Sequence, residues 1–414
     1  MHIGIAGPIA TADIASMLEG SPQDLPVGYP GAPLLATLIC ELLRLGHRVS
    51  AFTLSSDMPL HGGVVTAQGD NFSLSYIPKR PHAWRPNGLR PGRILDLYAF
   101  EREQLQRAIA KMAPDVVHAH WTYEFALAAL RTGLPHVVTC HDSPYRVARF
   151  YSKEKLTQSL YRWLRVLMAR KVLRQARCVT AVSSYMRNEV QGMALVPITV
   201  VPNPVDVYAL ALVRSRDVPT SPRFAMVCNG WQALKNPQPA MKAFARFHDR
   251  HPEAELHLYG SDFGAGQTAE TWAKQQRISA GMVFHGALPH KVLLKALSNA
   301  DLLVHPSLEE SFGLSIAEAM SMGLPVVAGE SSGAVPWVVG DGGVLCDVRQ
   351  ENAIYQAIEQ VLVPENYARF SITARERVES MFTASVVTSA YVAIYINALG
   401  YGRHNVDASY KCVA

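Results

Sequence analysis

305-HPSLEESFGLSIAEAMSMGLPVVA-328 is the stretch that decides the fold, because it joins the end of one strand to the start of the next. The apolar run before it, residues 301–304, predicts a buried parallel strand, and the Pro-Ser pair after His305 predicts a loop. A helix is expected from about Gly313, and a β-branched strand is expected from Val326. The stretch therefore predicts one strand, helix and strand unit of a parallel sheet.

The loop and the first helical turn of this stretch have the properties of an anion site. A helix N-terminus offers unpaired backbone N–H groups and a partial positive charge, which together hold a diphosphate without a metal ion. Gly313 allows the backbone to approach a ligand closely. Glu310 lies in the loop and Glu318 on the helix, where its carboxylate can reach a pair of ribose hydroxyls. These features predict a site for a sugar nucleotide.

The same residues resemble the acidic signature of the retaining GT-B glycosyltransferases of family 4. The resemblance is carried by Glu310, Phe312-Gly313-Leu314, Glu318 and the run Gly323-Leu324-Pro325-Val326-Val327. It implies an α/β fold of the GT-B class, in which two Rossmann-like domains with parallel sheets face each other across a cleft. It also implies a hexosyltransferase that takes its sugar from a nucleotide-diphosphate sugar, retains the anomeric configuration and needs no metal ion or other cofactor.

The resemblance also implies roles for individual residues. Glu310 would hold hydroxyls of the donor sugar and Glu318 the ribose. The donor diphosphate would lie against Ser311, Phe312, Gly313 and Leu314. No residue stands out as a covalent nucleophile, so the implied mechanism is attack from the face of the leaving group, with the leaving phosphate oxygen taking the acceptor proton.

Three further segments resemble the donor side of this family. Lys235 matches a phosphate-binding lysine, whereas Gly230 stands at the position of the arginine that accompanies it, so one phosphate cation is missing or is supplied from elsewhere. Gly286 belongs to the segment that flanks the nucleobase. Trp337 replaces the acid that ends a glycine-rich turn in the family, and we expect this turn to act through its backbone.

Two histidines follow strands predicted in the first half of the chain. Residues 114–121 and 136–140 read as buried strands, and His120 and His141 lie at their C-terminal ends, where ligands bind in parallel sheets. His141 resembles the family histidine that lies beside the transferred sugar, and Asp142 follows it. His118 and His120 share one face of their strand, but without a third ligand we predict no metal site.

Two loops complete the set of candidates in the first half. Gly31 precedes a predicted helix and is the usual place of an acceptor or diphosphate contact, although Pro30 departs from the double glycine of the family. A mobile surface loop is an equal alternative there. Asn203 lies in a Pro-Asn-Pro-Val-Asp segment that resembles the end of the first domain in the family.

The chain is long enough for two domains, because 414 residues exceed what one core usually organises. We expect an acceptor-side domain at 1–203, a linker at 204–223, a nucleotide-sugar domain at 224–383, a helix at 384–398 that packs back on the first domain, and a tail at 399–414. The six cysteines are scattered, which argues against a disulfide framework or a metal cluster. No leader pattern or apolar run of about 18 residues is present, so a cytoplasmic protein is expected.

Positive charge is concentrated in one segment. Residues 146–177 hold ten Lys and Arg and one acid, a local charge of +9 against +5 for the whole chain. A helix is expected at 154–175, with Leu160, Trp163, Leu164 and Leu167 on one stripe. Either this stripe packs in the core beneath a solvated basic face, or the helix is attracted to an anionic membrane surface. A second basic stretch, 79–93, is broken by prolines and is expected to be a surface loop.

The function expected from these patterns is transfer of a hexose from a nucleotide sugar to a glycan or lipid-linked acceptor, as in assembly of cell-surface polysaccharide. We expect no nucleic-acid partner, and a location in the cytoplasm or at the inner face of the membrane. A nucleotide-sugar epimerase of the same fold remains an alternative. A degenerate binding protein is another, because of the departures at Pro30, Gly230 and Trp337.

Overall fold

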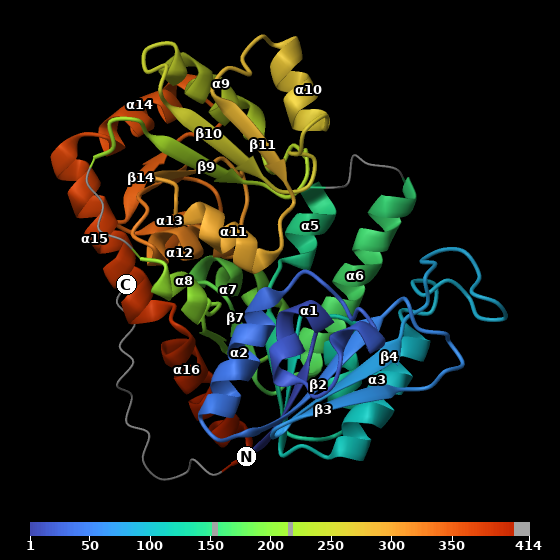
Figure 1. Cartoon of the computed structure of the whole chain (residues 1–414). Helices are drawn as coiled ribbons and strands as arrows, with labels where there is room; N and C mark the ends of the chain where they lie inside the picture. Colours follow the sequence, from blue (N-terminus) through green and yellow to red (C-terminus); the bar gives the residue numbers. More distant parts are fainter. Residues whose placement is uncertain (151–155, 214–217, 401–414) are drawn as a thin grey trace. The chain divides into compact units, whose positions relative to one another are not determined.

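The computed structural model describes residues 1–150, 156–213 and 218–400. The chain divides into two compact α/β units, each of which is described by itself (Figure 1). Unit 1 consists of Met1–Val182, Arg187–Val201 and the chain from Thr388 onward. Unit 2 consists of Ser183–Met186 and Pro202–Val387.

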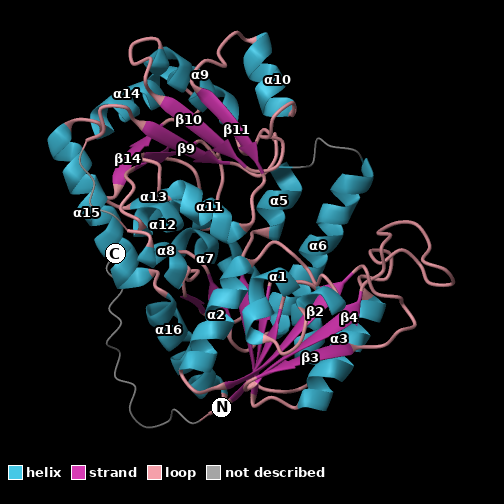
Figure 2. Cartoon of the chain, viewed as in Figure 1, coloured by secondary structure: helices cyan, strands magenta, loops and turns pink. Residues whose placement is uncertain are grey.

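Unit 1 is built on an eight-stranded sheet (Figure 2) with the order β3-β4-β2-β1-β5-β6-β7-β8. All neighbouring strands are parallel except β3 and β4, which pair antiparallel. The strands are β1 (His2–Ala6), β2 (Arg48–Ser55), β3 (Val65–Gly69), β4 (Phe72–Pro78), β5 (Val116–His120), β6 (His136–Cys140), β7 (Val179–Ala181) and β8 (Ile198–Val200). The central strands are buried on both faces, as is usual for parallel sheets, which helices cover on both sides.

The helices before β8 connect these strands. They are α1 (Thr11–Ile14), α2 (Pro33–Arg44), α3 (Ala99–Met112), α4 (Glu124–Arg131), α5 (Pro144–Phe150), α6 (Leu156–Gln175) and α7 (Ser184–Val190). α2 illustrates the local causes of these helices: Pro33 occupies its first turn, and Leu35, Leu38 and Leu42 form its buried face. Gly46, at φ +79°, follows the helix in the left-handed conformation that ends many helices.

Unit 2 is built on a six-stranded parallel sheet with the order β11-β10-β9-β12-β13-β14. Its strands are β9 (Arg223–Val227), β10 (Glu255–Tyr259), β11 (Met282–Gly286), β12 (Leu302–His305), β13 (Val326–Gly329) and β14 (Gly343–Cys346). The helices from here onward are α8 (Val207–Ala211), α9 (Pro237–His248), α10 (Thr268–Gln275), α11 (His290–Leu297), α12 (Leu314–Ser321), α13 (Val335–Val339), α14 (Glu351–Val361), α15 (Pro364–Met381) and α16 (Ala384–Ala398).

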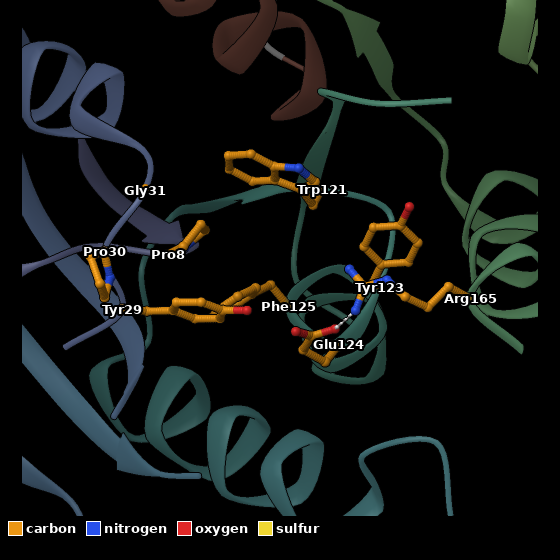
Figure 3. Close-up of a pocket in the computed structure, with 9 residues that line it drawn as sticks. All are labelled: Pro8, Tyr29, Pro30, Gly31, Trp121, Tyr123, Glu124, Phe125 and Arg165. Carbon is orange, nitrogen blue, oxygen red and sulfur yellow. Dashed lines mark ion pairs between the residues drawn. The ribbon is translucent and has the colours of Figure 1, made fainter. Parts of the chain in front are cut away.

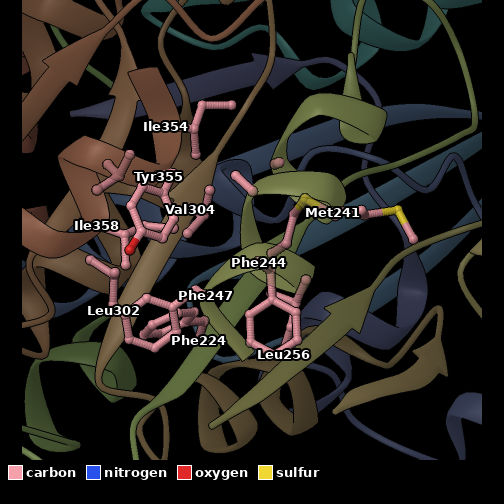
Figure 4. Packing of buried hydrophobic residues seen from close by; sticks show 14 of the residues in the cluster. Phe224, Met241, Phe244, Phe247, Leu256, Leu302, Val304, Ile354, Tyr355 and Ile358 are labelled. Atoms are coloured by element: carbon pink, nitrogen blue, oxygen red, sulfur yellow. The ribbon is translucent and has the colours of Figure 1, made fainter. Parts of the chain in front are cut away.

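The core of unit 2 lies between its sheet and the pair α9 and α14 (Figure 4). Phe224 of β9 packs against Phe244 and Phe247 of α9, with ring centroids 5.8 and 5.2 Å apart. Ile354 and Ile358 of α14 are fully buried in the same cluster. This packing fixes β9 and β12 as the centre of the sheet, from which the candidate site is built.

The basic stretch 79–93 has no helix or strand, as expected for a surface loop, but the Arg80 side chain within it is buried. The Arg80 side chain is fully buried and forms ion pairs with Asp96 at 2.7 Å and Glu101 at 2.6 Å. Two carboxylates satisfy the buried guanidinium, and the pairing ties the loop to α3.

Of the two alternatives for the stripe on α6, packing in the core is contradicted by the exposure of its side chains. Leu160, Trp163 and Leu167 are 49%, 42% and 58% exposed. The buried face of α6 is a neighbouring one, formed by Met168, Ala169, Val172 and Leu173. Residues 151–155, which include Lys153, Glu154 and Lys155 of the predicted basic segment, lie outside the described residues. Among the described helices, none is long and apolar enough to cross a bilayer.

Candidate functional site

Two loops of unit 2 meet where adjacent strands end. β9 pairs with β12, so the loop after β9 carries Lys235 to the loop after β12, which carries Glu310. The Lys235 ammonium donates a hydrogen bond of 2.7 Å to Glu310 Oε1. His305, the last residue of β12, places Nε2 3.4 Å from the same oxygen. The structure thus joins two of the predicted site residues through a direct ion pair.

Glu310 is ionised at any physiological pH. Burial opposes its ionisation, but the contact with His305 and the charge of Lys235 together lower the pKa of Glu310 to about 2. Its side chain is 17% exposed, so solvent still reaches the carboxylate. A fixed anion held by a cation in this way can accept hydrogen bonds from sugar hydroxyls.

The backbone of Glu310 is held by the glycine-rich turn after β13. Glu310 N–H donates to Ser332 O at 3.3 Å, and Ala334 N–H donates to Glu310 O at 2.9 Å. Gly333 adopts φ +66°, and a Cβ there would lie 2.6 Å from Glu310 O. Glycine is therefore required by both its conformation and the close approach.

The N-terminus of α12 is open to a ligand. Gly313 precedes the helix at φ +89°, and no side chain caps the first turn. Leu314 begins the helix. Ser183 Oγ donates a 2.7 Å hydrogen bond to Ser311 O and fixes the loop before the helix. Uncapped N–H groups and the helix dipole together attract an anion.

The Phe312 side chain is packed in an aromatic cluster. It is 2% exposed and lies edge to face on Phe382, with ring centroids 5.3 Å apart. Trp337 contacts both rings, at 6.4 Å from Phe312 and 5.7 Å from Phe382. The tryptophan that departs from the family pattern therefore completes an aromatic cluster beneath the loop.

Glu318 has a partner that sequence reasoning missed. Its carboxylate is 3% exposed, and Oε1 lies 2.6 Å from Nε2 of His290, the first residue of α11. Burial raises the pKa of Glu318, and His290 opposes this rise. Nothing in the sequence pairs these two positions, which are 28 residues apart. Tyr185, whose hydroxyl donates to the Glu309 carboxylate, is a second residue that no motif identified.

Three further candidates, Gly230, Gly286 and Asn203, are backbone positions or lie in loops. Gly230 adopts φ +95° and donates its N–H to Ser261 O at 3.1 Å. Gly286, at φ +76°, ends β11 and accepts from Gly260 N–H at 2.9 Å. Asn203 is 7% exposed in the loop after β8. Gly230 and Gly286 thus hold turns that few other residues could adopt.

Unit 1 brings His120, His141 and Asp142 together at the ends of β5 and β6. His120 Nδ1 and His141 Nε2 share a 2.9 Å hydrogen bond, and His120 Nε2 has no hydrogen-bond partner among the described residues. Trp121 stacks on His141 with a centroid distance of 4.1 Å and an interplanar angle of 24°. The Tyr123 hydroxyl donates to Asp142 Oδ2 at 2.9 Å.

A polar network beneath these histidines includes the end of the chain. His118 Nδ1 hydrogen-bonds the Tyr395 hydroxyl at 2.7 Å, and His118 Nε2 bonds Thr139 Oγ1 at 2.6 Å. Burial lowers the pKa of His118 and His120 well below the usual value, and it lowers the pKa of His141 to about 3. All three rings are therefore neutral at physiological pH. Among the described residues, no three His, Cys, Asp or Glu side chains are grouped to hold a metal ion.

Known proteins resemble this chain in sequence or in fold over most of its length. The mycobacterial glycogen synthase (Mycobacterium tuberculosis) is 29% identical over 302 residues, which are 69% of this chain and 69% of that protein. The structure of sucrose-phosphate synthase from Thermosynechococcus elongatus matches with a TM-score of 0.73 at 18% identity, covering 97% of this chain and 100% of that one. HepE of Anabaena, solved in complex with UDP and glucose, matches with a TM-score of 0.61 at 16% identity, covering 95% of this chain and 98% of that one.

Family models agree with these relatives. Residues 33–208 match the family described as Glycosyltransferase Family 4, and residues 214–377 match Glycosyl transferases group 1. The two matches together span well over half of the chain. The solved structures share the architecture of two Rossmann-like units. The chain therefore belongs to the family 4 glycosyltransferases of the GT-B fold and is a transferase enzyme.

Proposed function

We propose that this enzyme moves a hexose from a nucleotide-diphosphate sugar to a glycan or lipid-linked acceptor, with retention of the anomeric configuration and without a metal ion. The observation that carries this proposal is the ion pair between Lys235 and Glu310 beside the uncapped N-terminus of α12. It combines a cation and free N–H groups for a diphosphate with an ionised carboxylate for sugar hydroxyls. The UDP and glucose bound to HepE support a donor of this class.

Each residue then has one task in the reaction. Lys235 and the first-turn N–H groups of α12 stabilise charge that develops on the leaving diphosphate, which is commonly the largest contribution to catalysis. Glu310 accepts from donor hydroxyls and Glu318 from the ribose. The bond between the anomeric carbon and the phosphate oxygen breaks, the acceptor oxygen bonds to the same face, and the acceptor proton passes to the departing phosphate oxygen. His141, being neutral, offers a hydrogen bond to a sugar hydroxyl rather than a charge.

A screen of donors tests this proposal. We expect one of UDP, GDP or ADP, and the matching nucleotide hexose, to raise the melting temperature by several degrees, because a ligand at 100 times its Kd adds about 2.7 kcal/mol of stability. The product formed with the matching donor should keep the anomeric configuration when examined by NMR. Failure of every nucleotide to bind would reject the proposal, an inverted product would reject retention, and an epimer formed from donor alone would favour an epimerase.

We further propose that α5 and α6 bind an anionic membrane surface. Leu156 and Leu160 are 84% and 49% exposed, and Tyr145 of α5 contacts the exposed ring of Trp163 with centroids 5.9 Å apart. Basic side chains at 162, 170, 171 and 174 share the helix with this apolar stripe. Apolar side chains beside cations are suited to enter the headgroup region of an anionic bilayer.

The double variant Leu156→Gln, Leu160→Gln is expected to weaken binding to phosphatidylglycerol vesicles at least about tenfold, because each leucine contributes roughly 1.5–3 kcal/mol when fully buried. Sedimentation at low and moderate salt measures the effect. Leu89→Gln, which changes a fully exposed leucine in the loop before α3, is the control. Equal vesicle binding by all three proteins, or none by the wild type at either salt concentration, would contradict the proposal.

A further inference from the structure

The contact between His290 and Glu318 joins two helices of unit 2. His290 is the first residue of α11, and Glu318 lies in the second turn of α12. His290 Nε2 lies 2.6 Å from Glu318 Oε1. The short helix α8, which Asp206 caps, packs against both α11 and α12. All of these elements belong to unit 2, so the contact is a property of that unit alone.

Glu318 is buried, yet only one of its carboxylate oxygens is bonded. Its side chain is 4% exposed. Oε1 is bonded to His290, whereas Oε2 has no hydrogen-bond partner among the described residues and is not fully shielded from solvent. A carboxylate oxygen that is held in a buried place without a donor gains free energy from a ligand that donates a hydrogen bond to it. Oε2 is therefore the oxygen that is left for a ligand.

A second buried carboxylate shows that burial alone does not produce such a bond. Glu124 of unit 1 also has a side chain that is 4% exposed, and Figure 3 shows it paired with Arg165. The distance from Arg165 Nη1 to Glu124 Oε2 is 3.6 Å, which is beyond normal hydrogen-bond length. A nearby charge leaves a carboxylate free to turn, whereas the directional bond from His290 fixes the orientation of the Glu318 carboxylate.

The same bond helps Glu318 to remain an acceptor. Burial raises the pKa of Glu318, and His290 opposes this rise. The charge of Asp206 raises the pKa of Glu318 further. Without His290, both remaining influences would favour the protonated carboxyl, which donates through one oxygen and can no longer accept through both. His290 therefore supports both the orientation and the charge of the carboxylate.

We propose that His290 is a positioning residue, which holds the Glu318 carboxylate in the orientation where Oε2 accepts a hydrogen bond from a hydroxyl of the donor ribose. The inference rests on the proposed function, because Glu318 is assigned to the ribose there. Its consequence is selectivity: the bond from His290 makes the enzyme prefer ribonucleotides to deoxyribonucleotides. His290 acts on the nucleotide through Glu318.

Calorimetric titration of the full chain measures this selectivity. The probes are UDP, GDP and ADP, each compared with its 2′-deoxy and 3′-deoxy forms. The wild type should bind at least one ribonucleotide at least about tenfold more tightly than one of its deoxy forms, because a hydrogen bond to a charged group contributes roughly this factor. Equal affinity of the wild type for the ribonucleotide and both deoxy forms would overturn the assignment.

Two substitutions of His290 differ by one methylene group. His290→Asn carries an amide that is too short to reach Oε1, and we expect this variant to lose most of the preference for the ribonucleotide. His290→Gln carries an amide N–H about as far along the side chain as Nε2, and it should keep the preference. The His290 side chain is 21% exposed at a helix end, so both polar side chains are expected in a folded chain. Melting temperatures check this.

His251→Asn is the matched control. His251 is a partly exposed histidine of unit 2 beside another carboxylate, with Nδ1 3.8 Å from Glu253 Oε1. This variant should bind all the nucleotides as the wild type does, because neither side chain belongs to the site.

The pattern across ligands separates positioning from a structural role. Loss of the ribose contact weakens binding of the ribonucleotide and leaves the deoxy form unchanged, whereas a general defect of the site weakens both. Equal weakening of both forms in His290→Asn, or an unchanged preference in this variant, would overturn the assignment. So would a loss of preference in His290→Gln as large as that in His290→Asn.

Failure of the proposed function would give a different result. If the wild type bound none of the nucleotides, the proposed transfer reaction would be rejected, and the assignment of His290 with it. If the wild type bound ribonucleotides with the same preference as His290→Asn, the assignment of His290 alone would be rejected.

Discussion

Replacement of Lys235 by alanine is expected to lower kcat by about 10²- to 10³-fold, equivalent to roughly 3–4 kcal/mol of transition-state stabilisation. In the structure this ammonium donates to Glu310, and in the proposed reaction it meets the diphosphate of the donor. Charge on the leaving diphosphate grows as the glycosidic bond breaks, so the loss falls on kcat more than on KM. Steady-state kinetics with the nucleotide sugar found in the donor screen measure both constants.

Lys242 provides the control for this substitution. It lies exposed on α9, the helix that follows the Lys235 loop, and Lys242→Ala should leave both constants unchanged. If Lys235→Ala raised KM with kcat intact, the lysine would bind substrate and transition state equally, and its assignment to the leaving group would be wrong.

Acid should destabilise unit 1 steeply. His118, His120 and His141 are buried and neutral in the folded protein, whereas in the unfolded chain each takes up a proton near pH 6.5. Because their pKa values are lowered by folding, the stability that they contribute is present above pH 6.5 and lost as the pH falls below it. Each histidine lowers the free energy of unfolding by about 1.4 kcal/mol for each pH unit of acidification. The three together lower it by about 4 kcal/mol between pH 6 and pH 5.

Urea unfolding, monitored by pulsed hydrogen exchange in peptides from β5 and β6, measures the slope of the free energy of unfolding against pH. His120→Asn should reduce it by about one third, since one proton fewer is taken up on unfolding. His61→Asn, in the exposed loop between β2 and β3, should leave it unchanged. A free energy of unfolding that is constant from pH 7 to pH 5 would show that the three imidazoles do not behave as buried neutral groups.

Much of the fold could be read from the sequence because parallel strands leave a strong pattern. β6 was predicted at 136–140 and is found there, and α12 begins at Leu314, next to the predicted start at Gly313. α6 shows the limit of prediction from hydrophobic periodicity. It carries two neighbouring apolar stripes, and periodicity cannot decide whether Leu160 or Met168 is covered, since that depends on elements far away in the sequence.

The site was predictable only where single residues match a motif. Lys235 and Glu310 were each identified, but the contact between them spans 75 residues and leaves no local pattern. His290 belongs to no motif, and only the folded chain brings it to Glu318. The burial of Arg80 was not predicted for a related reason, because its acidic partners lie outside the stretch 79–93.

The bonds from α16 to the interior of unit 1 set an order of events during synthesis. Tyr395 bonds His118, and Tyr391 bonds Thr139, across 277 and 252 residues. Until residues 388–398 have left the ribosome, these buried groups lack their partners, so the first unit to emerge cannot complete its interior. Residues 202–387 belong to the other unit and are available to fold earlier. Unit 1, which contains the N-terminus, is therefore the last part of the enzyme to complete its folding. A chain that is released before residues 388–398 are made exposes the incomplete histidine network.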